Sequence, residues 1–152
     1  MKKNSGLLIL VFLCAGILVS CTKSTSPTND VTQNTPVQSS MTATVNGSSW
    51  VATNFSGTNV SGTLQIEGAA ADGSQITLSI PANSKAASYT AGGTNPCQAT
   101  YQLGTTYSRL TDGTIKITSI SNSAVSGTFS GTFTNATTTM TISNGAFTSS
   151  IQ

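Results

Sequence analysis

The sequence predicts an all-β domain: an antiparallel meander of about eight to ten strands that forms a sandwich or a partly closed barrel. Apolar and polar residues alternate with a period of two through much of residues 41–152. No long stretch of that region has the 3.6-residue period of a helix. Dipeptides of Asn or Asp followed by Gly, which favour tight turns, separate the alternating stretches.

The alternating stretches place apolar residues on one strand face and hydroxyl, amide or charged residues on the other. The residues expected to face inward are Val60, Gly62, Leu64, Ile66, Ile76, Leu78, Ile80, Ile115, Ile117, Val125, Phe129 and Phe133. The outward positions carry mostly Thr and Ser, which suit a pleated surface and keep it soluble without charge. Gly127 and Gly131 are also expected to face inward, where a missing side chain often marks a bend in a strand.

Four dipeptides predict hairpin turns: Asn46-Gly47, Asp72-Gly73, Asp112-Gly113 and Asn144-Gly145. A type I′ turn needs positive φ at both central residues, and Asn, Asp and Gly tolerate that conformation. At least three hairpins are therefore expected. The same assignment makes the two aspartates turn residues in place of calcium ligands or catalytic groups.

The first 20 residues predict a signal peptide. Two lysines precede an apolar run from Leu7 to Val19, which is shorter than the roughly 20 residues of a membrane-spanning helix. The following Leu18-Val19-Ser20-Cys21 resembles the bacterial lipobox. This resemblance implies that Cys21 receives a diacylglycerol, becomes the first residue of the mature chain and is acylated at its amino group. The alternative is an ordinary signal peptide with an incidental cysteine.

Residues 21–40 predict a lipidated cysteine followed by a disordered tether. The segment consists mainly of Thr, Ser, Pro, Asn and Gln, and Pro27 and Pro36 interrupt it. The first alternating stretch begins at Met41. We therefore expect a signal peptide at 1–20, Cys21 and its tether at 21–40, and a folded domain at 41–152.

Sorting signals next to Cys21 bear on localisation. Thr22 follows Cys21, at the position where lipoproteins that are retained at the inner membrane commonly carry an aspartate. Two or more acyl chains anchor a protein stably, so we expect a lipid-anchored envelope protein. Because Thr22 is not an aspartate, we expect this protein at the outer membrane, facing the periplasm. Exposure at the cell surface stays open, although the acidic residues that surface-exported lipoproteins carry are missing before Asp30.

Charge excludes some partners. Removal of residues 1–20 leaves four basic and four acidic residues: Lys23, Lys85, Arg109 and Lys116 against Asp30, Glu67, Asp72 and Asp112. A chain with no net charge has no electrostatic footprint for nucleic acid or anionic headgroups. The expected membrane contact is therefore the lipid anchor, and nucleic acid is not an expected partner.

Cys97 is the thiol that remains once Cys21 is alkylated, so no intrachain disulfide is expected. We interpret Cys97 as a small buried apolar residue. The alternative is an intermolecular disulfide or a metal or redox role, for which the chain offers no histidine as a partner.

An enzyme is not expected, and neither is a cofactor. The chain has no histidine, which removes the usual general base, metal ligand and triad partner. A carboxylate pair from Glu67, Asp72 and Asp112 is the conventional option left. Glu67 is expected on the polar side of a strand and the two aspartates in turns, which does not favour a convergent pair.

Aromatic residues are the candidate binding residues. The rings of Tyr89, Tyr107 and Trp50 could stack on sugars or contact apolar ligands, although core packing is the favoured interpretation of Trp50. Tyr101 alternates with Ala99 and Leu103 and is expected to point inward. Three functions stay open: a binding module for a glycan or small apolar ligand, an accessory subunit of an envelope assembly, and a carrier with an apolar ligand inside a barrel.

Several segments carry a family resemblance: "MTATVNGSSWVA", "SGTLQIEGAAADGSQITLSI", Tyr89, "GTIKITSISNSAVSGTFSGTF" and "ISNGAF". They are similar to a family of small uncharacterised lipoproteins of Bacteroidota-type Gram-negative bacteria. The resemblance implies a lipoprotein signal, an all-β domain of unknown function and no established activity. The matching residues are Asn46, Gly47, Trp50, Gly127, Thr128, Phe129, Asn144, Gly145 and Phe147, which implies turns and core but nothing catalytic.

A second resemblance is to lipocalins, which carry a glycine and a tryptophan near the first strand in a G-x-W spacing. Here Gly47-Ser48-Ser49-Trp50 is one residue longer. The lipocalin resemblance implies a barrel that encloses a small apolar ligand.

Overall fold

A computed structural model describes residues 37–152 and contains nine strands there and no helix. The strands are β1 (Ser40–Val45), β2 (Ser48–Val60), β3 (Thr63–Ala70), β4 (Ser74–Pro81), β5 (Ala87–Ala91), β6 (Gln98–Leu103), β7 (Thr106–Ile120), β8 (Ala124–Thr134) and β9 (Thr139–Ser150). The predicted all-β class and the strand number are confirmed. The predicted signal peptide, Cys21 and the predicted tether as far as residue 36 lie outside the described residues.

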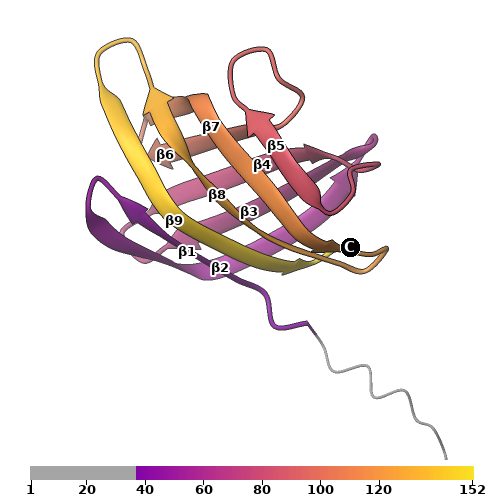
Figure 1. Cartoon of the computed structure of the whole chain (residues 1–152). Helices are drawn as coiled ribbons and strands as arrows, with labels where there is room; N and C mark the ends of the chain where they lie inside the picture. The colour runs from indigo at the N-terminus through magenta and orange to yellow at the C-terminus, as the bar shows by residue number, and fades with distance from the viewer. Residues whose placement is uncertain (1–36) are drawn as a thin grey trace, which may run out of the picture. The chain divides into compact units, whose positions relative to one another are not determined.

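Eight of the strands close into an antiparallel barrel (Figure 1). Around the ring the order is β1-β2-β3-β4-β6-β7-β8-β9, and β9 pairs with β1. Of the two predicted architectures, the barrel is the observed one, and its ring is closed. β5 is an additional strand that pairs with β7. A search of the described part of the chain finds no helix with the length and hydropathy to cross a membrane.

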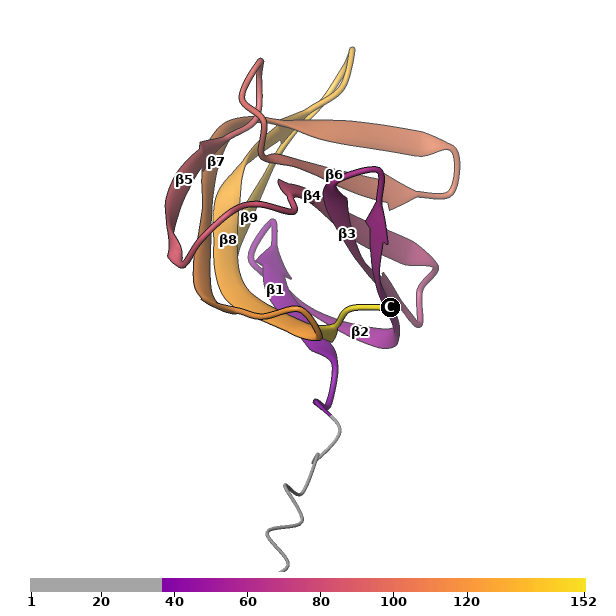
Figure 2. The ribbon, with the colours of Figure 1, turned by 90° about the vertical axis from the view of Figure 1, so that its right-hand side faces the viewer.

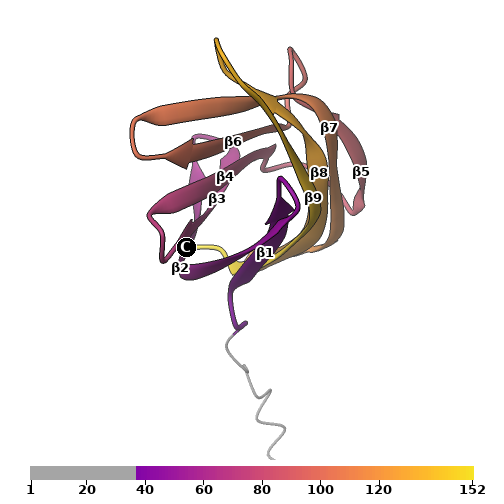
Figure 3. The same ribbon diagram turned by 90° about the vertical axis from the view of Figure 1, so that its left-hand side faces the viewer.

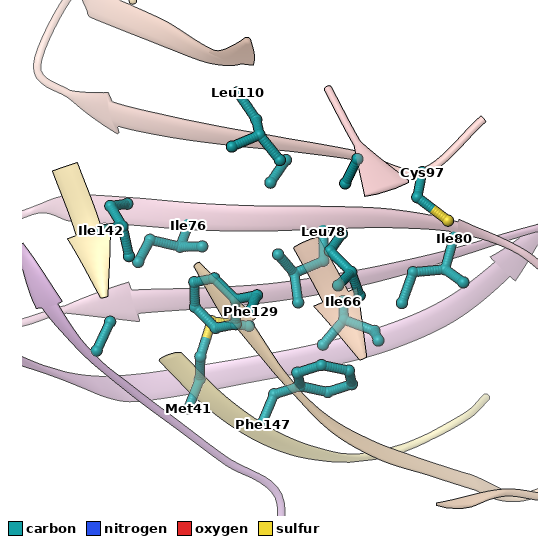
Figure 4. Close-up of a cluster of buried hydrophobic side chains, with 14 of the residues drawn as sticks. Met41, Ile66, Ile76, Leu78, Ile80, Cys97, Leu110, Phe129, Ile142 and Phe147 are labelled. Carbon is teal, nitrogen blue, oxygen red and sulfur yellow. The ribbon is translucent and has the colours of Figure 1, made fainter. Parts of the chain in front are cut away.

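The barrel interior is filled by the inward side chains that alternation predicts. On β4, Ile76, Leu78 and Ile80 are fully buried, and the residues between them are partly exposed. Figure 4 shows these side chains converging with others from strands across the barrel. The Phe129 and Phe147 rings are tilted with centroids 6.4 Å apart, within the usual range for aromatic pairs.

Two of the four predicted turns are confirmed. Asn46-Gly47 joins β1 to β2 with φ values of 47° and 83°, as a type I′ turn requires. Asp72-Gly73 lies between β3 and β4, where Gly73 has a φ of 81°.

The other two predicted turns are wrong, because β7 runs through Asp112-Gly113 and β9 runs through Asn144-Gly145. Both sites are irregularities within strands. The β7–β8 register shifts next to Asp112, and Asn144 has a φ of 50°. A Cβ at Gly113 would meet the carbonyl oxygen of Ser130, so this glycine allows β8 to approach closely.

A turn at Ser61-Gly62 was not predicted. Their φ values of 51° and 82° make a two-residue turn between β2 and β3, and Val60 pairs with Thr63. Paired residues share a sheet face, so Val60 lies on the face of Thr63 and not on that of Leu64. The predictions that Val60 and Gly62 face inward are therefore wrong.

The two ends of the barrel are closed differently. At the hairpin end lie the turns at 46–47, 71–73, 104–105 and 135–138 (Figure 3). At the opposite end, which we call the cleft end, lie the turns at 61–62 and 121–123 and a crossover, residues 82–86. Figure 2 shows this crossover running from β4 to β5.

Candidate ligand-binding cleft

β5 does not belong to the eight-stranded ring, but it pairs with the same edge of β7 as β6 does. It pairs with Gly113–Ile117 of β7, and β6 pairs with Thr106–Arg109 of the same strand. β6 also pairs with β4, which closes the wall there, whereas the structure shows no ladder between β5 and β4 in the described residues. Beside the last residues of β4, the barrel wall therefore has a gap.

Cys97 marks one end of this gap. It forms a parallel bridge with Ala91 of β5, and the next residue, Gln98, pairs with Ser79 of β4. The backbone at this point lies between two strands. Just before Cys97, the loop between β5 and β6 stands away from the barrel (Figure 1), so this loop does not fill the wall farther along.

A cleft of about 570 Å³ lies in this part of the wall. It is lined by Pro81 of β4, residues 83–86 of the crossover, Ala87 and Tyr89 of β5, and Pro96 and Cys97. The volume is within the range of about 300–1,000 Å³ that is typical of small-ligand sites. The lining is mainly apolar, with Lys85 as its charged residue.

Tyr89 is the predicted binding residue that lies in this cleft. Its pairing with Ile115, which is fully buried, places the ring on the inward strand face, where it packs against the core half-buried. The Tyr89 hydroxyl accepts a hydrogen bond from the Lys85 N–H and donates one to the Lys85 carbonyl, both at 2.9 Å. The ring forms part of the cleft wall, and the hydroxyl holds the crossover; we call these two hydrogen bonds the Tyr89 clasp.

Trp50 lies at the hairpin end and is 5% exposed. Its indole N–H donates to the hydroxyl of Ser74 at 2.7 Å. Ser74 in turn donates to the Asp72 carboxylate through its hydroxyl at 2.5 Å and its backbone N–H at 2.9 Å. These two bonds lower the pKa of the Asp72 carboxyl from its ordinary value. Trp50 is thus a core residue whose ring presents no exposed face to a ligand.

The structure does not bring Tyr107 to the cleft. Tyr107 is 47% exposed and pairs with Gln102 next to the β6–β7 turn, at the hairpin end. Tyr101 points inward and is 9% exposed, but Leu103, which was expected to share its inward face, is 46% exposed. Of the three predicted binding residues, Tyr89 is the one that lies in a concave site.

Cys97 is buried beside the cleft, and burial raises the pKa of its thiol from the ordinary value. A protonated thiol is a poor nucleophile and a poor metal ligand. Glu67 lies on β3, Asp72 in a turn and Asp112 on β7, and none of the three lines the cleft. In residues 37–152, no three His, Cys, Asp or Glu side chains gather where they could hold a metal ion.

A second hollow, of about 400 Å³, lies on the outer face of β5, β7, β8 and β9. Thr114, Thr128, Ser88 and Ser130 provide hydroxyl groups to it, and Ala146 lies at its edge. This outer hollow is hydroxyl-rich, and its one lining aromatic residue, Phe129, has its side chain buried in the core.

The cleft was not predicted from the sequence, because the crossover that forms part of it was not predicted either. The available signal was Pro81 together with Pro96, since proline lacks an N–H and interrupts strand pairing. These two residues bound the region in which β4 and β6 are no longer paired.

Comparison with known proteins gives one match. A family model described as a domain of unknown function (DUF6252) matches residues 36–150, which include all nine strands. No curated protein and no solved structure matches the chain. The match agrees with the expectation of an uncharacterised domain family.

Proposed function

The chain belongs to the DUF6252 family, and from this premise we propose that it is a non-catalytic protein that binds a small, largely uncharged ligand in the cleft between β4 and β5. One observation carries the proposal. The gap in the barrel wall exposes a cleft of about 570 Å³ with an apolar lining and a tyrosine ring. Such a concave, mostly apolar site with a few polar groups is the usual form of a ligand pocket.

The lining suggests how a ligand is recognised. Pro81, Ala87 and the Tyr89 ring offer apolar contact, and the exposed crossover offers backbone and side-chain hydrogen-bonding groups. Lys85 is a single exposed cation in the lining, and the mature chain has no net charge. We therefore propose recognition by shape, aromatic contact and neutral hydrogen bonds.

The absence of catalysis is part of the proposal. It is supported by a sequence without histidine and by three carboxylates, Glu67, Asp72 and Asp112, that lie away from the cleft. The Cys97 thiol, which does line the cleft, has a raised pKa and is not activated by a neighbouring base among the lining residues.

We place the ligand in the wall and not along the barrel axis. A closed eight-stranded barrel is compatible with a lipocalin-like carrier, whose ligand lies inside the ring. Here the inward side chains of β3, β4, β7 and β8 are packed together and buried. A ligand on the axis would have to displace them, whereas the cleft is already open.

We further propose that Cys21 carries the lipid that holds this domain at the outer membrane, facing the periplasm. The support is the lipobox sequence Leu18-Val19-Ser20-Cys21. Intact mass of the protein from membranes should show a diacylglycerol and an added acyl chain on a chain that begins at Cys21. If the Cys21→Ala chain still fractionates with membranes, the anchor is elsewhere.

The cleft is tested with a ligand panel and a matched pair of variants. The mature Cys21→Ala chain is titrated with fatty acids, oligosaccharides and short peptides, and its thermal unfolding is followed, because a ligand of the folded state raises the melting temperature. Ala86→Trp fills the cleft from the exposed crossover, and Ala146→Trp makes the same change at the outer hollow.

We expect Ala86→Trp to abolish the ligand-dependent shift and Ala146→Trp to keep it. The proposal fails if no member of the panel raises the melting temperature. It also fails if Ala86→Trp responds as the unmodified chain does.

A further inference from the structure

We infer that the ligand of this cleft is a short extended peptide that adds a strand to the free edge of β5. The inference rests on the proposed function, because it names the ligand class of the same cleft. A strand edge presents backbone N–H and C=O groups that can pair with another chain, and peptide binding by strand addition uses them.

On β5, the backbone groups of Ser88 and Thr90 point to the edge away from β7, on the side of the gap that adjoins the cleft. The Gly92 N–H donates to the Cys97 carbonyl at 2.9 Å, on the edge that points away from β7. Backbone groups of successive residues in a strand point to opposite edges. Thr90 and Ser88 therefore share the edge of the Gly92 N–H, whereas Tyr89 directs its backbone groups toward β7.

These edge groups have no partner farther along the gap. Within residues 37–152, no hydrogen bond outside the strand ladders involves the backbone of Ser88 or the N–H of Thr90. Both residues lie on an exposed part of β5. A peptide in the cleft can pair with them without breaking a bond that the structure shows.

The facing edge of β4 is closed to such pairing. The Ala82 N–H donates to the Gly62 carbonyl at 2.8 Å, on the β3 side, so the preceding residue, Pro81, faces the gap. Proline has no N–H to donate. The Pro81 carbonyl already accepts a hydrogen bond from the Ser84 N–H at 3.0 Å. A peptide would therefore pair with β5 and make side-chain contact with β4.

The gap lies in line with the backbone at Cys97 and Gln98, which runs between β5 and β4. Cys97 bridges to Ala91 on one side, and Gln98 pairs with Ser79 on the other, so the backbone of the chain occupies this position at the start of β6. Figure 4 shows Cys97 next to Ile80, at the side of the core where this position begins. Between Cys97 and the crossover, the gap runs beside about four residues of β5, or roughly 13 Å at about 3.3 Å per residue.

The surroundings select the side chains of the peptide. Inward side chains would contact the Tyr89 ring, Cys97 and the adjoining core, and outward ones would lie beside the exposed Ser88 and Thr90. Side chains in a strand alternate between the two faces. The expected peptide therefore alternates small or medium apolar residues with polar uncharged ones. An acyl chain would instead cover the edge groups of β5 without giving them partners.

A proline variant with a matched alanine variant tests the backbone contact. Ser88→Pro removes an N–H on the free edge of β5, and the ladder between β5 and β7 does not use that group. Ser88→Ala removes the side chain and keeps the N–H. The probe is a library of fluorescein-labelled, capped pentapeptides with Thr at positions 1, 3 and 5 and Ala, Val, Ile or Phe at positions 2 and 4. Binding to the mature Cys21→Ala chain is followed by fluorescence anisotropy.

We expect at least one peptide to bind, Ser88→Pro to weaken it by about tenfold or more, and Ser88→Ala to change it less than about threefold. The bound peptide should also slow hydrogen exchange of the Ser88 and Thr90 amides in the unmodified chain. Circular dichroism and the melting temperature of Ser88→Pro check that the barrel is folded.

The outcomes separate this inference from the proposed function. If no peptide binds, but a fatty acid or sugar does and Ala86→Trp blocks it, the peptide inference is overturned and the cleft remains a binding site. If Ser88→Pro, folded, binds peptide as well as Ser88→Ala does, strand addition to β5 is overturned. If nothing in the panel or the library binds, both proposals fail.

Discussion

The hairpin end and the cleft end of the barrel each use an aromatic side chain with a polar tip, but in opposite surroundings. At the hairpin end, the Trp50 N–H binds the hydroxyl of Ser74, which is fully buried and bound in turn to Asp72. At the cleft end, the Tyr89 hydroxyl binds the backbone of Lys85, which is exposed on the crossover. One contact is sealed inside the core, and the other is open to water.

This difference indicates different roles for the two residues. A buried hydrogen bond is expensive to break, because the groups left behind have no water to replace the partner. An exposed hydrogen bond exchanges readily with water and contributes less. We therefore expect Trp50 to stabilise the barrel and Tyr89 to hold a crossover that can be released when a ligand enters.

Removal of the two aromatic side chains should give the largest contrast. Trp50→Ala should lower the free energy of unfolding by about 3–5 kcal/mol, because it opens a cavity in the core and leaves Ser74 without its partner. Tyr89→Ala should cost less than half as much, because the ring is half-buried and lines an open cleft. Urea unfolding of both variants measures the difference, and equal losses would mean that Tyr89 is as much a core residue as Trp50.

A smaller change isolates the hydrogen bonds of the hairpin end. Ser74→Ala leaves the buried Trp50 N–H unpaired and should cost about 1–3 kcal/mol in urea unfolding. Ser84→Ala, on the crossover, makes the same atomic change at a side chain outside this network and serves as its control. A loss no larger than that of Ser84→Ala would show that the Trp50 N–H finds water or another acceptor.

The Tyr89 clasp is tested by removal of one oxygen atom. Tyr89→Phe keeps the ring but removes both hydrogen bonds to Lys85, and it should cost no more than about 1 kcal/mol, since these bonds are exposed. The Lys85 amide should exchange with deuterium faster in the variant, and the amides of β4 should not change. Unchanged exchange at Lys85 would show that other contacts hold the crossover.

The regular part of the barrel could be predicted from the sequence because local patterns determine it. Alternation in β4 and β8 gave the inward faces correctly, as at Ile76, Leu78 and Phe129. The Asn46-Gly47 turn was predicted from its dipeptide. These elements depend on residues close in sequence, and the strands that follow one another also pair.

The same local patterns failed where a neighbouring strand decides the conformation. Asp112-Gly113 favours a turn by itself, but in the barrel β8 pairs with β7 before, at and after this dipeptide. Because Gly113 has no side chain, β8 can approach β7 closely there. The turn at Ser61-Gly62 was not predicted, because alternation that continues on each side of a two-residue turn has the same pattern as one continuous strand. No local pattern shows that β5 leaves β4 unpaired, so Tyr89 was predicted as a candidate without the cleft that makes it one.

The smallest expected effect is the pH dependence of the hairpin end. The Ser74 hydroxyl and backbone N–H donate to Asp72 and lower the pKa of its carboxyl from the ordinary value in the folded protein. A carboxyl whose folded pKa is below its unfolded value adds stability that is complete above the unfolded pKa, and this stability is lost as the pH falls through the folded pKa.

Asp72→Asn keeps the acceptor oxygen and the turn, but the asparagine side chain does not titrate in the pH range of a carboxyl group. The advantage of the unmodified chain over Asp72→Asn in urea unfolding should therefore be constant from about pH 7 to about pH 5 and should shrink below about pH 4. Asp72 is fully exposed, so the advantage itself is small. The control is the same pair in a Ser74→Ala background, where loss of the hydroxyl donor should reduce both the advantage and its decline in acid. If the difference persists unchanged into acid in the chain that retains Ser74, the charge of Asp72 does not strengthen these bonds.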